Sequence, residues 1–239
     1  MSRTSTGGVV DAVESVASTG VSGGATTTTA SAGGRGRRSA RPTGEDRERA
    51  ILATAERLLA ERGFDGFSVD DLARGAGLSR PTFYFYFASK DAVVLALLDR
   101  VIAEATRSTP PLDFVGDPRG TWRAIIGAIV AVFDEHRAVT VAGAQAHAGS
   151  AEIRALWSAA MDRWVTDTAV LVEAERARGA APAGLPAREL AVALNLMNER
   201  VLSGAFTGAE PAVGVDRLTD VLLAVWWPAI YGTELPTES

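Results

Sequence analysis

Apolar residues recur at three- and four-residue spacing along most of the chain after residue 44, and this spacing is typical of amphipathic helices. The first such segment covers residues 45–62 and ends at Gly63. Its apolar positions, set among charged ones, are Ile51, Leu52, Ala55, Leu58 and Leu59. No stretch alternates between apolar and polar residues as a half-buried strand would, and we find no internal repeat. The pattern therefore predicts an all-α fold.

Two short helices are predicted directly after this segment. Ser68 stands three residues before Asp71, which is the spacing of a capping box, and glycines at 75 and 77 end the helix that begins there. Ser79 is suited to cap the next helix, where Pro81 falls in the first turn and needs no helical N–H partner. With a glycine-containing turn at AGLS between the two short helices, the order is that of a helix-turn-helix unit.

Only longer helices are predicted in the rest of the chain. Ser89 is suited to cap a helix whose apolar face is Val94, Leu97, Leu98, Val101 and Ile102. Proline and glycine signals separate the later segments, which we place at residues 119–135, 137–147, 150–178, 186–206 and 215–230. The last two segments would form half of a four-helix bundle between two copies of the chain. Pro228 is expected to kink or end the last helix.

Five aromatic residues follow one another at positions 83–87. Successive residues differ by about 100° around a helix axis, so the five rings cannot all face one core. Phe83 and Phe87 suit the core, whereas Tyr84 falls near a second face, where its hydroxyl could bond a phosphate oxygen. Arg80 and Thr82 lie at the N-terminal end, which in a helix-turn-helix unit points toward base edges. The alternative is that all five rings fill a core. It is disfavoured because the helix is short and two of the rings carry polar hydroxyl groups.

Charge is distributed unevenly along a chain whose formal net charge is -5. Residues 35–90 carry eleven Arg and Lys against eight Asp and Glu, whereas residues 91–239 carry twelve against nineteen. Lys90, the only lysine, stands at the start of a helix, where it could contact a phosphate. Residues 1–34 are rich in Gly, Ser, Thr and Ala and are expected to be disordered. The next residues form either a solvated tail or an arm laid on DNA, with arginines at Arg35, Arg37, Arg38 and Arg41.

Several classes of protein are excluded by what the sequence lacks. There is no cysteine, so disulfide scaffolds and thiolate sites are excluded, and we expect no metal and no cofactor. No apolar run reaches the roughly 20 residues that span a bilayer, and no signal peptide is recognisable, so a cytoplasmic protein is expected. His136 and His147 have no carboxylate cluster or nucleophile at a recognisable spacing. With no glycine-rich phosphate loop either, an enzyme is not expected.

The segment FSVDDLARGAGLSRPTFYFYFASKDAV resembles the helix-turn-helix of TetR-type transcriptional repressors. The likeness extends over nearly the whole chain after residue 35, including GRRSARP, ERARGAAP and AVALNLMNER. The resemblance implies an all-helical homodimer that binds DNA. It also implies a tail with a basic arm at 1–42, a DNA-binding domain at 43–88 and a ligand-binding and dimerisation domain at 89–235. Tyr86 departs from the pattern, because many relatives have histidine there.

The resemblance also assigns contacts to the motif residues. Ser68, Thr82, Tyr84 and Lys90 match positions that hold the DNA backbone. Arg80, Pro81 and Phe85 match positions nearer the bases, and Arg37, Arg38 and Arg41 would belong to the arm.

Two aromatic stripes and a pair of amides indicate a ligand pocket in the C-terminal part. One stripe runs along residues 150–178 and the other along 119–135, and either could be plain core. Asn195 and Asn198 lie beside apolar residues of the 186–206 segment. An amide that faces tryptophans without a partner costs about 1–3 kcal/mol, so this placement favours a cavity that a ligand or water fills. The alternative is that both amides face solvent.

By resemblance, the pocket is long and mostly apolar. The matching residues are Trp122, Ile129, Phe133, Trp157, Met161, Trp164, Thr168, Asn195, Asn198, Leu202 and Trp226. Ile129, Asp167 and Ser203 stand where a relative has aromatic rings, so the pocket is expected to be wider or wetter. We therefore expect a repressor that binds operator DNA as a homodimer and is released by an apolar or amphipathic small molecule. The alternative is a ligand-independent DNA-binding protein whose C-terminal part only dimerises.

Overall fold

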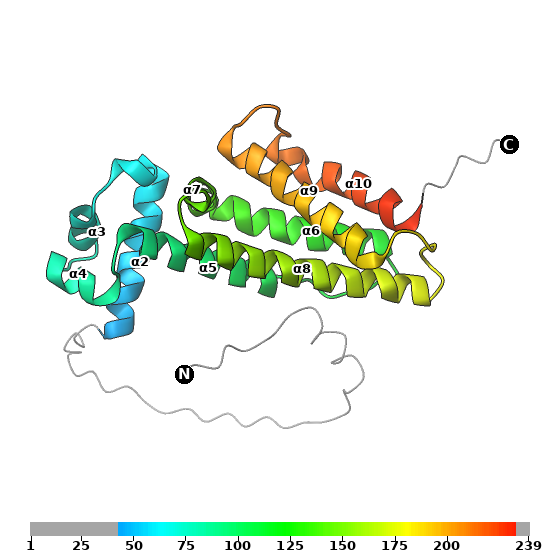
Figure 1. The fold of residues 1–239 in the computed structure, drawn as a ribbon, viewed down its shortest axis with the longest axis horizontal. Coiled ribbons are helices and arrows are strands. Elements are labelled where there is room, and N and C mark those ends of the chain that lie inside the picture. Colours follow the sequence, from blue (N-terminus) through cyan, green and yellow to red (C-terminus); the bar gives the residue numbers. More distant parts are fainter. Residues whose placement is uncertain (1–42, 233–239) are drawn as a thin grey trace, which may run out of the picture.

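The computed structural model describes residues 43–232, and within that range the chain is helical without any strand. The all-α prediction is confirmed. Figure 1 shows two parts: a small group of helices, α2 to α4, at one end, and a larger group, α6 to α10, extending away from it. Helix α5 connects them. The predicted tail and arm, including Arg37, Arg38 and Arg41, lie outside the described residues.

The first helix, α2 (Gly44–Arg62), is fixed at both ends by local sequence. Thr43 caps it and forms a capping box with Asp46, so the helix begins one residue before the predicted start at residue 45. Gly63 ends it with φ 68°, a conformation that favours glycine. All five apolar positions predicted for this helix are buried. They form the core of the small group of helices.

The helix-turn-helix unit follows after a short 3-10 turn, η1 (Phe64–Gly66). Helix α3 (Val69–Gly75) begins with the predicted capping box, and α4 (Arg80–Tyr86) begins with Ser79 as its cap. Gly77 lies between them with φ 69°. A Cβ at Gly75 would stand 2.4 Å from the Thr54 side chain, so α3 approaches α2 as closely as only glycine permits. The turn predicted at AGLS is confirmed.

Helix α5 (Lys90–Arg107) is shared between the two parts of the molecule. Its predicted apolar face is buried, and the helix packs against α2 on one side and against α6, α7 and α8 on the others. Helix α7 (Arg137–His147) also packs against α2. One hydrophobic core therefore continues through both parts, and a domain boundary after residue 88 remains a prediction.

The C-terminal part consists of long helices in two packed pairs. Helix α8 (Ala151–Ala177) packs mainly against α9 (Ala187–Thr207). Helix α6 (Pro118–Glu135) packs mainly against α10 (Leu218–Tyr231), which follows the short turn η2 (Val215–Arg217). Pro228 lies inside α10, and the helix continues to Tyr231 rather than ending at the proline.

Candidate nucleic-acid interface and ligand cavities

The aromatic residues of α4 separate into a buried set and an exposed set. Phe83 is fully buried and Phe87 is 9% exposed, whereas Tyr84 and Phe85 are 45% and 83% exposed. The alternative in which all five rings fill a core is therefore wrong. Apart from an edge-to-face contact with the Tyr86 ring, Phe85 is open to solvent, so α4 presents an apolar and a phenolic ring on its outer side.

Arg80 lies on the same outer face and is held there by two neighbours. Its Nη1 lies 3.3 Å from Asp70 Oδ2 of α3, and its Nη2 donates to the Tyr84 hydroxyl at 3.3 Å. The bond to Tyr84 and the charge of Asp70 raise the pKa of the guanidinium, so it stays charged. The side chains of Arg80 and Asp70 are both more than half exposed, so their ion pair contributes little to stability.

The other predicted contact residues of the turn are also at the surface. Ser68 is exposed and bonds Asp71 as the cap of α3, while the Thr82 hydroxyl lies 2.8 Å from that of Ser79. Pro81 is exposed in the first turn of α4. These residues therefore lie on the surface of the helix-turn-helix unit and bond only to close neighbours in sequence.

The side chain of Lys90 contacts the turn between α2 and α3. Its Nζ donates to the carbonyl oxygens of Phe64 at 2.7 Å and Phe67 at 3.2 Å, and it lies 4.1 Å from the centre of the Phe64 ring. The ammonium therefore holds the turn between α2 and α3 against the start of α5. Two of its three N–H groups serve the fold, and this long-range role was not visible in the sequence.

Two adjacent cavities occupy the C-terminal part. The large cavity, of about 200 Å³, lies among α5, α6, α7, α8 and α9. The small cavity, of about 50 Å³, lies among α5, α6, α8, α9 and α10. They share four lining residues, namely Ile129, Trp164, Asn195 and Asn198. All eleven residues predicted for the pocket line one cavity or the other, so the structure brings them together.

Each cavity also has walls that sequence reasoning missed. Helix α7 contributes Thr140, Gly143 and His147 to the large cavity. Thr106 of α5 and the two residues just after that helix, Ser108 and Thr109, line the small one. The small residues of α7 were the only signal in the sequence. At Gly143 an added Cβ would come within 3.0 Å of Leu98, which shows how closely α5 and α7 approach.

The two asparagines are buried, so the alternative in which they face solvent is wrong. Asn195 is 8% exposed and donates to Thr168 Oγ1 and to the Ala191 carbonyl, and Asn198 is 9% exposed. Trp226 Nε1 donates to Asn198 Oδ1 at 2.9 Å. The Asn198 amide nitrogen has no bond to another described residue and lines both cavities. It is therefore a donor available to a ligand.

The indole rings around the cavities are held by contacts between rings and by hydrogen bonds from their N–H groups. Phe133, Trp157 and Trp164 pack edge to face around the large cavity, with ring centres 5.9–6.1 Å apart. In the small cavity, Trp122 Nε1 donates to the Tyr231 hydroxyl at 3.1 Å, and that hydroxyl donates to Glu175. Burial and the bond to Glu175 raise the pKa of Tyr231, which keeps the hydroxyl protonated.

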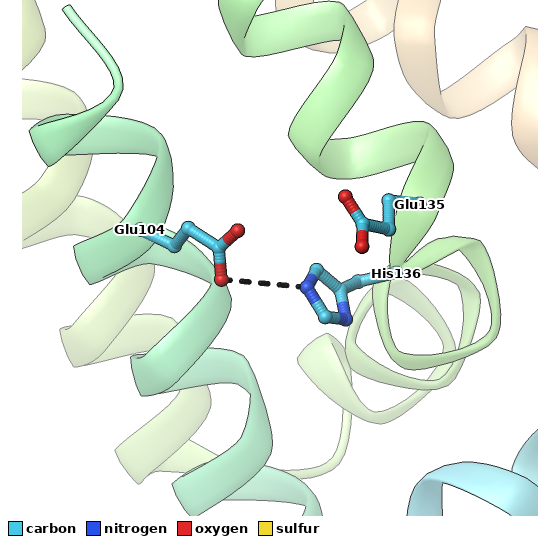
Figure 2. A group of neighbouring side chains, drawn as sticks. All are labelled: Glu104, Glu135 and His136. Atoms are coloured by element: carbon cyan, nitrogen blue, oxygen red, sulfur yellow. Dashed lines mark ion pairs between the residues drawn. The ribbon is translucent and has the colours of Figure 1, made fainter.

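A histidine and three carboxylates meet where α2, α5, α6 and α7 come together. His136 Nδ1 contacts Glu56 of α2, its Nε2 lies 3.4 Å from Glu104 of α5, and Glu135 is adjacent (Figure 2). The ligand-type atoms of Glu104, Glu135 and His136 lie within 4.8 Å of one another. Burial lowers the pKa of His136, but the bond to Glu56 and the surrounding negative charges outweigh it, so the pKa is raised.

The sequence has no carboxylate cluster at a recognisable spacing from either histidine, whereas the fold places three carboxylates around His136. Glu56 and Glu104 are distant in sequence and reach His136 only through the packing of α2 and α5 against α7. The imidazole faces a carboxylate on each side. The cluster joins the small group of helices, through α2, to the cavity-bearing part of the molecule.

Helices α9 and α10 leave an apolar surface uncovered. Val192 and Leu196 of α9 are 36% and 47% exposed, and Val225 of α10 is 44% exposed. The sequence predicts an apolar partner for this pair of helices, and the exposed side chains are consistent with one.

Within residues 43–232, no helix is both long and apolar enough to cross a membrane.

Comparison with known sequences identifies both parts of the chain. Residues 51–97 match the bacterial regulatory protein family tetR, and residues 122–232 match the C-terminal domain of the transcriptional regulator EthR. The HTH-type transcriptional regulator EthR of Mycobacterium tuberculosis (strain H37Rv) is 54% identical over 203 residues, which cover 83% of this chain and 93% of that protein. The EthR of Mycolicibacterium smegmatis is 48% identical over the same shares.

Comparison with solved structures also identifies transcriptional regulators as relatives. A protein of Saccharomonospora viridis described as a transcriptional regulator, crystallised in complex with choline, is 26% identical with a TM-score of 0.62, and the match covers 74% of this chain and 94% of that one. A TetR-like transcriptional regulator from Rhodococcus sp. RHA1 is 26% identical with a TM-score of 0.57, covering 81% of this chain and all of that one. These relatives are regulators rather than enzymes. The helix-turn-helix, the continuous helical fold and the likeness over most of the chain show that the protein belongs to the TetR family of transcriptional regulators, among its EthR-like members.

Proposed function

We propose that the protein is a ligand-responsive repressor, which binds operator DNA as a homodimer and is released by an apolar or amphipathic small molecule. The observation that carries the proposal is the course of α5. This helix begins in the core of the DNA-binding part, and farther along it contributes Leu98 to the large cavity and Thr106 to the small one. A ligand that alters either cavity therefore acts on the helix that positions α4.

The homodimer is proposed to form through the uncovered face of α9 and α10. Two-fold symmetry would place Val192, Leu196 and Val225 against the same residues of the second copy and close a four-helix bundle. The two α4 helices of a dimer must lie about one duplex turn, roughly 34 Å, apart to enter successive major grooves. A shift of α5 in each copy would change that spacing, and DNA and ligand would then compete.

The DNA contacts are proposed in two classes. Ser68, Thr82 and Tyr84 are proposed to contact phosphates, as are Arg37, Arg38 and Arg41. Arg80, Pro81 and Phe85 are proposed to lie nearer base edges. Lys90 is proposed to act on DNA chiefly through the turn that it holds, because its ammonium is bonded to Phe64 and Phe67.

The cavities support a ligand sensor over a protein that only dimerises. The second function requires aromatic stripes packed solid and asparagines exposed to solvent, whereas the two asparagines are buried against a cavity of about 200 Å³. The choline complex of the Saccharomonospora viridis regulator supports the idea that this fold holds a small molecule.

The test is a titration of DNA-bound protein with a series of apolar amides and esters. The operator would first be located by footprinting of fragments that flank the protein's own gene. We expect compounds that quench tryptophan fluorescence to release the operator. Linkage further requires that saturating operator weaken ligand binding by the same factor. Quenching without any change in operator affinity would contradict the proposed coupling.

A further inference from the structure

Phe85 is the most exposed aromatic side chain among the described residues, at 83%. Phe83, two positions earlier on α4, is fully buried. Successive residues differ by about 100° around a helix axis, so these two rings point in nearly opposite directions. Leaving a phenylalanine ring in water is unfavourable, and in the described part of the chain its one aromatic contact is the edge of Tyr86. The ring is therefore available to a partner outside the chain.

Two stripes of side chains run along the outer side of α4. Arg80 and Tyr84 are four residues apart and form a polar stripe, in which the guanidinium donates to the phenol at 3.3 Å. Pro81 and Phe85 are also four residues apart, both are exposed, and they form an apolar stripe beside the first. Neither side chain of the apolar stripe carries a hydrogen-bond donor or acceptor. This stripe can therefore recognise a partner only through apolar contact.

The position of α4 indicates which partner fits the apolar stripe. The face proposed for dimerisation belongs to α9 and α10, whereas α4 lies at the other end of the molecule (Figure 1). Helix α4 is the second helix of the helix-turn-helix unit, and in such units the second helix lies in the major groove of DNA. The guanidinium of Arg80 on the neighbouring stripe is a cation, which suits the same partner. We therefore consider what the floor of the groove offers to Phe85.

The major groove presents one apolar group among its base edges. All four base pairs show hydrogen-bond donors or acceptors there, and thymine adds a C5 methyl group. A ring placed against the donors and acceptors would strip them of water without replacing the lost hydrogen bonds. A ring placed against the methyl group removes apolar surface from water on both sides. The thymine methyl group is therefore the chemical match for the apolar stripe.

We propose that Phe85 reads the operator sequence by contacting the C5 methyl group of a thymine in the major groove, with Pro81 widening the same apolar surface. This inference rests on the proposed function, because it names the group on the operator that one residue recognises. Burial of a single methyl group corresponds to about a fourfold change in affinity. Phe85 would thus favour thymine at one position of each half-site, and Arg80 is left to bond neighbouring base edges.

The test replaces each thymine of the footprinted operator in turn with deoxyuridine, which lacks only the methyl group. Affinities are measured by fluorescence anisotropy without any effector. At one thymine of a half-site, the uracil duplex should bind the wild type about fourfold more weakly than the parent duplex. Phe85→Ala should bind both duplexes equally, because the contact is absent. If no thymine shows a loss that Phe85→Ala removes, the proposal is overturned.

The matched control is Val115→Ala, at an exposed apolar residue outside the helix-turn-helix unit. Val115 is 84% exposed and lies between α5 and α6, so its truncation should leave the fourfold uracil effect in place. Phe85→Ala is expected to fold, because its side chain has little to lose in packing. If this variant binds operator and random DNA more weakly by one factor, and uracil has no effect on the wild type, the ring packs on the sugar–phosphate backbone and the proposal is wrong.

Two further outcomes separate this inference from the proposed function. If the operator is bound and released by a ligand but uracil has no effect at any thymine, the proposed function stands and the reading of thymine is wrong. If uracil has the expected effect but no compound releases the DNA, the reading of thymine stands and the ligand response is wrong. Absence of any sequence-specific binding to DNA would overturn both.

Discussion

The helix-turn-helix unit and the cavity walls are stabilised over very different distances along the chain. In the former, Ser68 bonds Asp71 and Ser79 bonds Thr82, each three residues away. In the latter, Trp122 and its partner Tyr231 are 109 residues apart, and Trp164 and Thr106 are 58 apart. The DNA-binding surface is therefore built by local capping, with polar groups that can exchange their partners for DNA. The cavity walls depend on the packing of the whole C-terminal part.

The largest expected contrast is between an aromatic residue of the cavity wall and one of α4. Trp122 is 1% exposed, and truncation of a buried tryptophan costs about 3–5 kcal/mol, so Trp122→Ala should lower the free energy of unfolding by that order. Phe85→Ala, at a residue 83% exposed, should change it by less than about 0.5 kcal/mol. Urea unfolding of both variants measures the two free energies of unfolding. Similar decreases in the two variants would contradict the expected contrast.

This result also bears on the choice of variants for ligand studies. Trp122→Ala is expected to weaken the ligand response by damaging the fold, so a loss of response in this variant would not identify a contact. Asn198→Ala should also destabilise the fold, though less, because it leaves the Trp226 N–H without its acceptor. A weaker ligand response in this variant would therefore not by itself identify a contact either.

Lys90 is the exception within the DNA-binding part, because its partners are 26 and 23 residues away. Lys90→Ala should lower the free energy of unfolding by about 1 kcal/mol, since a partly exposed charged donor and two carbonyls lose their bonds. If the ammonium contacts no phosphate, the slope of log operator affinity against log salt should stay as in the wild type. A slope reduced by about 0.9 would instead show a direct phosphate contact.

The same difference in range explains which features the sequence could predict. Ser68, Ser79 and the glycine at 77 act within a few residues, so their spacing is sufficient to place α3, α4 and the turn. The apolar stripes likewise predicted which rings of α6 and α8 face inward. The contacts of Lys90, the partners of His136 and the α7 wall require knowledge of how helices pack, which no local pattern contains. Resemblance to the family supplied the pocket residues but not their hydrogen-bond partners.

The pair of contacts at His136 joins the two regions and should make their packing depend on pH. Two cations, Arg49 and Arg100, line the same cleft as His136. Burial lowers the pKa of His136 in the folded protein, but Glu56, Glu104 and Glu135 outweigh it and raise the pKa. Its unfolded value is about 6.5, so the stabilisation is fully present below that pH and is lost as pH rises through the higher folded value. The free energy of unfolding of the wild type relative to His136→Gln should therefore fall between pH 5.5 and 8.5.

Glu56→Gln is the matched control for this pH dependence. It removes the carboxylate that bonds Nδ1 and should flatten the profile while the imidazole is still present. The contrary result is that the wild type and His136→Gln differ in free energy of unfolding by the same amount at pH 5.5 and 8.5. That result would show that the cluster contributes packing only.

The smallest expected effect is that of Tyr84→Phe, which removes one exposed hydroxyl. That hydroxyl accepts a hydrogen bond from Arg80 at 3.3 Å, and because both side chains are exposed its loss should change the free energy of unfolding by less than about 0.5 kcal/mol. If the hydroxyl contacts a phosphate, Tyr84→Phe should weaken binding to operator and to random duplex by the same few-fold factor, since a phosphate contact carries no sequence information.

Fluorescence anisotropy with both duplexes at one salt concentration gives the ratio of operator affinity to random-duplex affinity. Arg80→Ala should lower that ratio if the guanidinium is near a base edge, and Tyr84→Phe should leave it unchanged. A lower ratio for Tyr84→Phe would mean that the phenol acts by orienting Arg80, because the hydroxyl is the only part of the side chain removed.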